Sequence, residues 1–174
     1  MHRMHSHFEL FGLAPAFGLE ADALERSYRE IQSRVHPDRF AHAGDAERRA
    51  SLQWTTRVNE AYRTLKDPVQ RAQHLLALHG VDVAFETNTA MPPDFLAQQM
   101  ELRESVEEAV GKKDPSPLDA LRKDLNKARQ SLQRQIADAI DAKKDYPGAA
   151  ALVRKLQFLD KLDAEIDAAY DTIE

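Results

Sequence analysis

Apolar side chains recur every three or four residues along almost the whole chain, and this spacing constrains the fold more than any other feature. In the segment 21–35 the apolar residues are Leu24, Tyr28, Ile31 and Val35. Such spacing places side chains on one side of an α-helix. Apart from the short stretch GVDVAF at 80–85, no segment has a convincing strand pattern. The sequence therefore predicts an all-α fold.

Prolines divide the N-terminal part into helices with short connections. Pro37 disfavours a helical backbone at His36 and ends the first helix, and Pro68 ends a second helix that begins near residue 46. A shorter helix then runs to Gly80. Two long helices joined by a loop predict an antiparallel hairpin. The side of the second helix expected to face the first carries Ala50, Trp54, Val58, Ala61, Tyr62 and Leu65.

Three further amphipathic helices follow the segment 81–93, where the periodicity breaks and a linker is predicted. The first spans about 94–110 and the last about 147–170. The middle helix begins after Ser116, which is predicted to be its N-cap. Amphipathic helices with short connections predict an antiparallel three-helix bundle. The core stripe expected on the middle helix of this bundle is Leu118, Leu121, Leu125, Ala128, Leu132 and Ile136.

The composition excludes several classes of site. The 174 residues include no cysteine, so the chain offers no disulfide, thiolate nucleophile or cysteine-ligated metal. No apolar run approaches the roughly 20 residues needed to span a bilayer. The first residues, MHRMHSHFELFGL, lack the long apolar core of a signal peptide. A cytoplasmic location is therefore expected.

Charge is distributed unevenly along the chain. The formal net charge is −5, which argues against nucleic-acid binding by the chain as a whole. Residues 21–80 hold ten Lys or Arg and eight Asp or Glu, a net charge of +2, which leaves −7 for the rest. A mildly basic part and an acidic part suit two different partners better than one.

The stretch RVHPDRF, at residues 34–40, places an imidazole, a rigid ring and a carboxylate between two helices. Catalysis, metal binding and contact with another protein are the three functions to compare. A catalytic His–Asp pair also needs a nucleophile, an oxyanion site and a sheltered pocket, which a hairpin tip does not offer. The histidine spacing matches no compact metal signature. Contact with a protein is therefore the favoured function. Two groups of side chains would be the candidate metal ligands: one is His2, His5 and His7, and the other is His36, Asp38 and His42.

The N-terminal part of the sequence resembles a J-domain. The resemblance lies in HPDRF, in the helix before it, and in VNEAYRTLKDP at 58–68 after it. In that family the His-Pro-Asp loop docks on a DnaK-type chaperone and stimulates its ATPase. The resemblance implies a J-domain over residues 1–80, with no catalysis and no cofactor of its own. The chaperone-binding residues that it implies are His36, Pro37, Asp38 and Arg39 in the loop and Arg26, Arg29 and Arg34 in the helix before it.

Four other stretches resemble the HscB family of co-chaperones for iron–sulfur cluster assembly. They are HFELFGL, RAQHLLALHG, FLAQQMELRE and VRKLQFLDKLDAEI. The resemblance then covers nearly the whole chain, as a J-domain, a linker at 81–93 and a bundle at 94–174. In this family the bundle binds the scaffold protein IscU, and the co-chaperone delivers it to the DnaK-type ATPase HscA. The alternative is a J-domain co-chaperone that serves other client proteins.

Some apolar residues lie away from the core stripes of the bundle helices. Leu96 and Met100 fall a quarter turn or more from the stripe of their helix, and Phe158 is about 90° from that of the last helix. Single exposed apolar residues are common. Several on neighbouring helices, next to acidic residues, predict a contact patch. Matched by position, the HscB resemblance implies a scaffold-binding surface of Leu96, Met100, Glu101, Glu104, Glu108 and Phe158.

Overall fold

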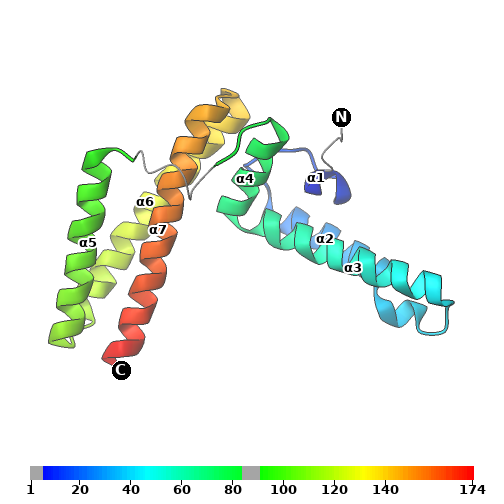
Figure 1. Cartoon of the computed structure of the whole chain (residues 1–174), viewed down its shortest axis with the longest axis horizontal. Coiled ribbons are helices and arrows are strands. Elements are labelled where there is room, and N and C mark those ends of the chain that lie inside the picture. Colours follow the sequence, from blue (N-terminus) through cyan, green and yellow to red (C-terminus); the bar gives the residue numbers. More distant parts are fainter. Residues whose placement is uncertain (1–5, 84–90) are drawn as a thin grey trace.

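The computed structural model describes residues 6–83 and 91–174. Every regular element in these residues is helical, which confirms the predicted all-α fold (Figure 1). The helices form two arms that diverge from a shared apex, one a helical hairpin and the other a helical bundle. Among the described helices, none combines the length and apolar content that a membrane-spanning helix requires. Residues 84–90, which make up half of the predicted linker, lie outside the described residues.

The N-terminal arm is a hairpin of α2 (Ala21–Val35) and α3 (Asp45–Lys66), which lie side by side (Figure 1). The Tyr28 ring stacks on the Tyr62 ring with centroids 4.0 Å apart, and the Tyr28 hydroxyl donates to Asn59 Oδ1 at 2.7 Å. The predicted antiparallel hairpin is therefore confirmed. Its fully buried apolar residues are Leu24, Val58, Ala61 and Leu65.

Two shorter helices close the base of the hairpin. α1 (His7–Leu10) packs on α3, and α4 (Pro68–Leu78) begins at the proline predicted to open it. Asp67 caps α4 by accepting the Gln70 N–H at 3.3 Å. The His7 N–H donates to His74 Nε2 at 3.0 Å, and the two imidazole rings stack. The N-terminal segment is thus attached to α4 as well as to α3.

One expectation about the hairpin is wrong, because Trp54 and Ala50 are exposed instead of packed against α2. Trp54 keeps 45% of its surface accessible. α2 ends at Val35, whose carbonyl oxygen accepts hydrogen bonds from Ser51 Oγ at 2.6 Å and Thr55 Oγ1 at 3.2 Å. These two residues therefore face α2 at this level, and Trp54, one helical step away, does not.

The C-terminal arm is the predicted antiparallel three-helix bundle. It consists of α5 (Pro93–Lys112), α6 (Ser116–Ala137) and α7 (Tyr146–Ile173). An ion pair of 2.8 Å between Arg129 and Asp160 joins α6 to α7. The fully buried apolar residues with the largest side chains in this arm are Leu118, Ile136, Val153, Leu156, Leu162 and Ile166.

Both ends of α6 differ from the sequence-based expectation. Ser116 is the first helical residue and not the N-cap, which is Pro115, and the Ser116 N–H is satisfied by Asp114 Oδ1 at 3.0 Å. At the other end, α6 continues into a π-helical turn, η2 (Asp138–Ala142), that periodicity did not predict. This turn matters because it carries Asp141.

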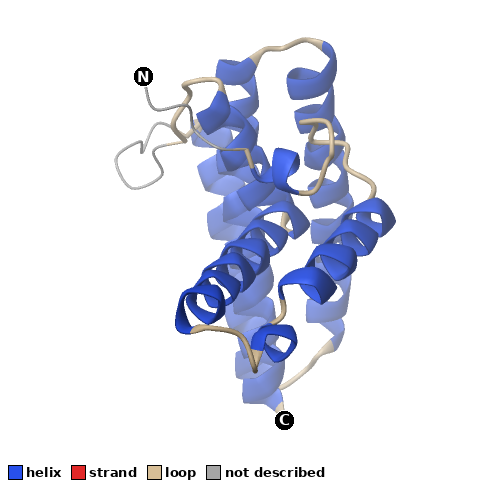
Figure 2. Cartoon of the chain, turned by 90° about the vertical axis from the view of Figure 1, so that its right-hand side faces the viewer, coloured by secondary structure: helices blue, strands red, loops and turns tan. Residues whose placement is uncertain are grey.

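The two arms are joined at the apex by side chains far apart in the sequence. The carboxylate of Asp141 accepts the backbone N–H groups of Phe17 at 2.8 Å and Gly18 at 2.9 Å. α4 packs on α7, and the His79 ring stacks on the Tyr146 ring at 4.0 Å. Buried apolar residues form one continuous core through both arms. Seen from the side of its tip, the hairpin projects in front of the bundle (Figure 2).

Candidate functional site

The tip of the hairpin, residues 36–39, has a backbone shaped by its proline. His36 follows the last residue of α2 and is extended, with φ −57° and ψ 135°, as expected before Pro37. Pro37 then opens a 3-10 turn, η1 (Pro37–Phe40). His36 Nδ1 accepts the Asp38 N–H at 3.2 Å and so caps this turn. An imidazole nitrogen that accepts carries no proton, which leaves the Nε2–H free for a partner.

The carboxylate of Asp38 points into solvent. Its side chain is 94% exposed, and Oδ2 lies 3.5 Å from His36 Nδ1. Arg39 folds back, and its Nη1 donates to the Ser33 carbonyl at 3.1 Å. The tip therefore presents a carboxylate and an imidazole from a backbone held on both sides by hydrogen bonds.

The arginines of α2 are exposed, as predicted, but two of them are already paired. Arg29 forms an ion pair with Glu25 at 2.7 Å, and Arg34 forms one with Glu30 at 2.5 Å, each four residues away on the same helix. Arg26 makes no ion pair with any described residue. Exposed pairs of this kind contribute only about 0.2–1 kcal/mol, so a partner's acidic groups could replace the glutamates at low cost.

The metal hypothesis finds no support in the described residues. Across 6–83 and 91–174, no group of three or more His, Asp or Glu side chains is placed to hold a metal ion. His36, Asp38 and His42 are not brought together as ligands. His2 and His5 lie outside the described residues.

The bundle patch consists of Leu96, Met100, Glu101, Glu104, Glu108 and Phe158. Leu96 is 39% and Met100 is 64% exposed, so both predicted exposures are confirmed. Leu96, Met100 and Glu104 are spaced by four residues and lie along one side of α5. Of the acids, Glu108 pairs with Lys112 Nζ at 2.7 Å, and this hydrogen bond lowers the pKa of the Glu108 carboxyl.

Phe158 differs from the other members of the patch because it is half-buried. Its ring meets the Phe95 ring edge-on, with centroids 6.0 Å apart. The contact joins α7 to the start of α5, next to Leu96. The structure thus places the α7 aromatic residue beside the α5 residues with which it was grouped.

Two surfaces were missed by the sequence analysis. Near the tip, Leu52 is 56% exposed, and Trp54 borders a shallow apolar hollow with Val35 and Phe40. The guanidinium carbon of Arg57 lies 5.4 Å from the centroid of the Trp54 ring. Leu52 lies off the apolar stripe of α3, and this was the one signal available in the sequence. The second surface is a groove in the bundle, described below.

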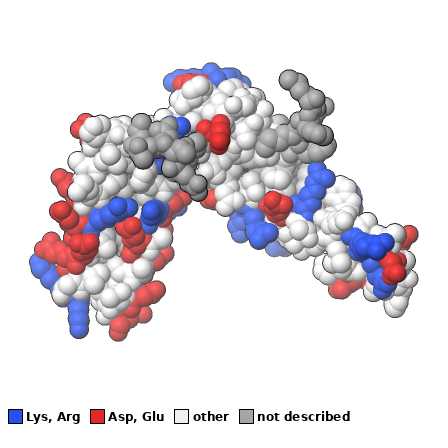
Figure 3. All heavy atoms as spheres, viewed as in Figure 1, with Lys and Arg blue, Asp and Glu red and all other residues white. Residues whose placement is uncertain are grey.

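Charged side chains differ between the arms in the view of Figure 3. Lys and Arg side chains are prominent along the hairpin, whereas acidic side chains are numerous on the bundle and are mixed with basic ones. This agrees with the sequence-based expectation that the chain presents different charge to two partners.

An exposed His-Pro-Asp loop on a helical hairpin, joined to a three-helix bundle, is the architecture of a J-domain co-chaperone. A co-chaperone protein HscB homolog of Burkholderia mallei (strain SAVP1) is 50% identical over 169 residues, covering 97% of this chain and 96% of the relative. The chain belongs to the HscB co-chaperone family, as its sequence indicated. A further HscB homolog, from Azoarcus sp. (strain BH72), is 48% identical over 168 residues, covering 97% of this chain and 95% of the relative.

Domain and structure comparisons agree with this assignment. Residues 91–167 match the family described as the HSCB C-terminal oligomerisation domain. The structure of chaperone HscB from Vibrio cholerae superposes with a TM-score of 0.86, at 36% identity, over 98% of this chain and 100% of that one. Human co-chaperone protein HscB shares the fold, with a TM-score of 0.89 at 24% identity, over 97% of this chain and 83% of that one.

Proposed function

We propose that this chain is a non-enzymatic, cytoplasmic co-chaperone of iron–sulfur cluster biogenesis. It delivers the scaffold protein IscU to the DnaK-type chaperone HscA and stimulates the ATPase of that chaperone. The observation that carries the proposal is the separation of two exposed surfaces on two arms: the polar tip at 36–39 and the apolar, acid-fringed bundle patch. Each surface suits a different partner.

The tip contributes a contact of fixed shape. Pro37 and the His36–Asp38 hydrogen bond limit the conformations of the loop, so less entropy is lost when it docks. The exposed Asp38 carboxylate is suited to a bidentate arginine on the chaperone. Arg26, Arg29 and Arg34 are exposed on the helix that leads to the tip and would guide an acidic surface into register.

The bundle patch contributes a contact that buries apolar surface. Leu96, Met100 and the exposed edge of Phe158 would be covered by the scaffold, and the surrounding glutamates would select a basic rim. Most of the binding energy of such interfaces comes from a few apolar anchors. Met100, with the largest exposed fraction of the three, is therefore expected to be the principal anchor.

The test is a double dissociation between the two surfaces of the full chain. Asp38→Asn should abolish stimulation of HscA ATPase and leave the affinity for IscU unchanged, because the tip lies on the other arm. Leu96→Ala, Met100→Ala and Phe158→Ala combined should weaken IscU binding by about 2–4 kcal/mol in calorimetry and spare stimulation of HscA measured without IscU.

Matched controls are available on the same chain. Asp171→Asn changes an exposed carboxylate far along α7, and Leu52→Ala with Trp54→Ala removes exposed apolar surface from the hairpin instead of the bundle. If stimulation survives Asp38→Asn, the tip is not the chaperone contact. If the hairpin pair weakens IscU binding as much as the bundle triple does, the scaffold does not select the bundle patch.

The alternative proposal keeps the tip and changes the cargo, so that the chain is a J-domain co-chaperone for other clients. Full-length chain that stimulates a DnaK-type ATPase but shows no affinity for IscU would favour it.

A further inference from the structure

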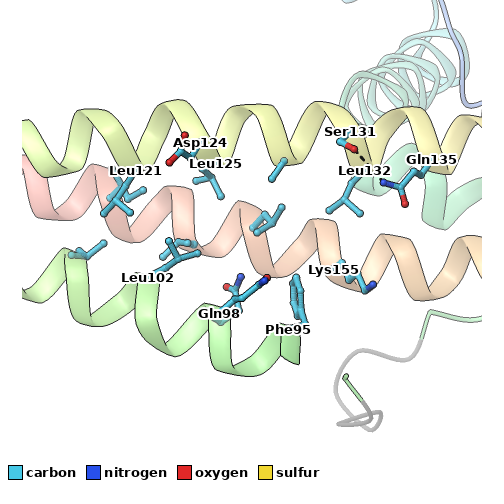
Figure 4. Close-up of a pocket in the computed structure, with 16 residues that line it drawn as sticks. Phe95, Gln98, Leu102, Leu121, Asp124, Leu125, Ser131, Leu132, Gln135 and Lys155 are labelled. Carbon is cyan, nitrogen blue, oxygen red and sulfur yellow. Dashed lines mark hydrogen bonds between the residues drawn. The ribbon is translucent and has the colours of Figure 1, made fainter. Parts of the chain in front are cut away.

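The bundle contains a groove that none of the functions above uses. It lies between α5 and α6, with α7 as its floor, and has a volume of about 410 Å³ (Figure 4). Binding pockets in proteins commonly measure about 300–1,000 Å³. Apolar side chains from all three helices line it, among them Phe95, Leu102, Leu125, Leu132, Leu159 and Leu162.

The groove exists because α5 does not cover the whole apolar stripe of α6. Ala128, a member of the predicted core stripe, is exposed at the groove, and Leu121 is only half-buried. Arg103 on α5 forms an ion pair with Glu165 on α7 at 3.3 Å, and Phe95 packs on Phe158 of α7. Both contacts join α5 to α7, and α5 also packs on α6 but leaves Ala128 uncovered.

A buried amide at the groove has an unused hydrogen-bonding group. Gln99 is 4% exposed and lines the groove, and its Oε1 has no hydrogen-bond partner among the described residues. Buried polar atoms are normally paired. Gln99 Oε1 is therefore an unsatisfied acceptor within the wall of the groove, although the atom itself is buried.

The rim of the groove carries one charge of each sign at opposite ends. Lys155 lies at the end near Phe95, and Asp124 lies at the other end, near Leu121 (Figure 4). Neither charge forms an ion pair with a described residue, although the Lys155 ammonium lies 5.9 Å from the Phe95 ring centroid. Both are free to meet charges on a guest.

We propose that this groove binds an amphipathic helical segment of the client protein, with the apolar side of that helix in the groove. The proposal rests on the proposed function in one respect, that the bundle is the arm that holds the client. From Phe95 to Val106, α5 rises about 16 Å. A guest helix presents apolar residues at i, i+4, i+7 and i+11 over the same length, which matches the helix-in-groove mode of recognition.

A helix fits the walls of the groove better than an extended segment does. The walls are α-helices, whose backbone N–H and C=O groups are already paired within each helix. A strand laid on them would bury its own backbone groups without partners, whereas a helix satisfies its backbone internally. The occupant is therefore helical.

The charges at the rim also set the direction of the guest. Acidic side chains are favoured near the N-terminus of a helix and basic ones near the C-terminus. A guest with acids in its first turn at Lys155 and bases in its last turn at Asp124 pairs full charges with the rim and suits its own dipole, and these full charges outweigh the opposing half-charges of its backbone ends. It would run parallel to α5.

The groove is separate from the bundle patch on the surface of α5. On a helical wheel, Leu96 and Met100 lie about 100° and 140° to one side of Phe95, whereas Gln98, at the groove, lies about 60° to the other side. Phe95 itself touches Phe158 and also lines the groove. One client can therefore occupy both surfaces around α5.

The experiment uses the full chain and a synthetic helical peptide of about 18 residues as the probe. The peptide is alanine-rich and labelled with fluorescein, with leucines at i, i+4, i+7 and i+11, glutamates in its first turn and lysines in its last. Fluorescence anisotropy should show saturable binding. Ala128→Phe fills the groove from an exposed position and should weaken binding at least tenfold. Ala120→Phe, an exposed position of α6 outside the groove, should change it by less than about twofold.

Charge reversal tests the direction of the guest. Lys155→Glu should weaken binding of the probe, and a peptide with lysines in place of its first-turn glutamates should bind this variant better than it binds the wild-type chain. Circular dichroism of each variant checks that the helices are retained. Equal binding by the Ala128→Phe and Ala120→Phe chains would overturn the proposal.

Two further measurements separate this proposal from the proposed function. Ala128→Phe should weaken IscU binding severalfold with the bundle patch intact, and unchanged IscU affinity would overturn the assignment of the groove to the client. If IscU fails to bind the wild-type chain at all, the proposed function fails while the probe still reports on the groove. A dimer of the wild-type chain that disappears in Ala128→Phe would show that a second copy occupies the groove, and would also overturn the proposal.

Discussion

The base of the hairpin and the α5–α6 side of the bundle bury their apolar stripes to different extents. In the hairpin, α1 and α4 close the base, and Val58, Ala61 and Leu65 of α3 are inaccessible to solvent. In the bundle, α6 and α7 pack closely, but α5 leaves part of the α6 stripe open at Ala128. The comparison teaches that an apolar stripe predicts a helix but does not predict whether a neighbour covers it.

The two arms also present their candidate contacts differently. The tip depends on backbone conformation, since Pro37 and the His36–Asp38 hydrogen bond shape it. The bundle patch depends on side chains of ordinary helices, and its shape comes from the way α5 and α7 pack. Local sequence is therefore sufficient to find the tip. Helical spacing also finds the exposed residues of the patch, but the contact between Phe95 and Phe158 that positions the α7 member is seen only in the tertiary structure.

The largest expected effect tests whether the core at the base of the hairpin is more completely buried than the wall of the bundle groove. Leu65→Ala in the hairpin should lower the free energy of unfolding by about 2–5 kcal/mol, because it leaves a cavity in a closed core. Leu102→Ala, in the wall of the open groove, should cost only about 1 kcal/mol, because part of this side chain is already exposed. Urea unfolding followed by circular dichroism measures both, and equal losses would mean that the bundle is as closed as the hairpin.

The second prediction concerns the junction between the arms. Asp141→Ala removes the acceptor of the Phe17 and Gly18 N–H groups and should destabilise the fold by about 1–2 kcal/mol. It should also broaden the distribution of distances between labels on the two arms. Because the chain has no cysteine, labels at His42→Cys and Lys112→Cys can be placed without removing a native thiol.

The control for this junction is Asp138→Ala, which removes a partner of Lys143 at 3.0 Å within the same π-helical turn and leaves the junction intact. If both variants broaden the distances equally, Asp141 has no special part in joining the arms.

The smallest expected effect is a pH dependence of the free energy of unfolding that comes from His74, at the base of the hairpin. Burial, and to a lesser extent the neighbouring His7, lowers the pKa of His74 to about 4, so the folded chain favours the neutral imidazole. In the unfolded chain His74 has its ordinary pKa of about 6.5. As pH falls below about 6.5 the unfolded state binds more protons, and stability should decrease until pH reaches about 4.

The expected loss of stability between pH 7.5 and pH 5 is on the order of 1 kcal/mol. His74→Gln should remove this contribution, so the difference between the stabilities of variant and wild type should change with pH. A constant difference over that range would contradict the prediction.

Most of the helices could be predicted from the sequence, because their spacing and their prolines are local signals. α2 begins and ends where the stripe from Leu24 to Val35 and Pro37 indicate. Errors occurred where geometry depends on a neighbour. Trp54 follows the spacing of its stripe, yet Ser51 and Thr55 face the end of α2 in its place. Ser116 starts α6 because Asp114 takes the capping interaction.

The junction and the groove could not be predicted for a related reason. Asp141 meets Phe17 and Gly18 from more than 120 residues away, through a π-helical turn that has no clear signature in the sequence. The groove depends on how α5 packs relative to α6 and α7, and the contacts of Arg103 and Phe95 with α7 join residues more than 60 positions apart in the sequence. The spacing of residues along the sequence does not predict distances between helices that are far apart in the chain.

The junction at Asp141 has a consequence for how the chain could act on its partners. Under the proposed function, cargo bound to one arm and an ATPase bound to the other would be separated by a nearly constant distance, because both arms are fixed to one core. A stiff connection between the two binding sites raises the effective concentration of the cargo at the one position that the connection allows, and lowers it at all other positions. The angle between the arms would then decide which part of an ATPase the cargo can reach.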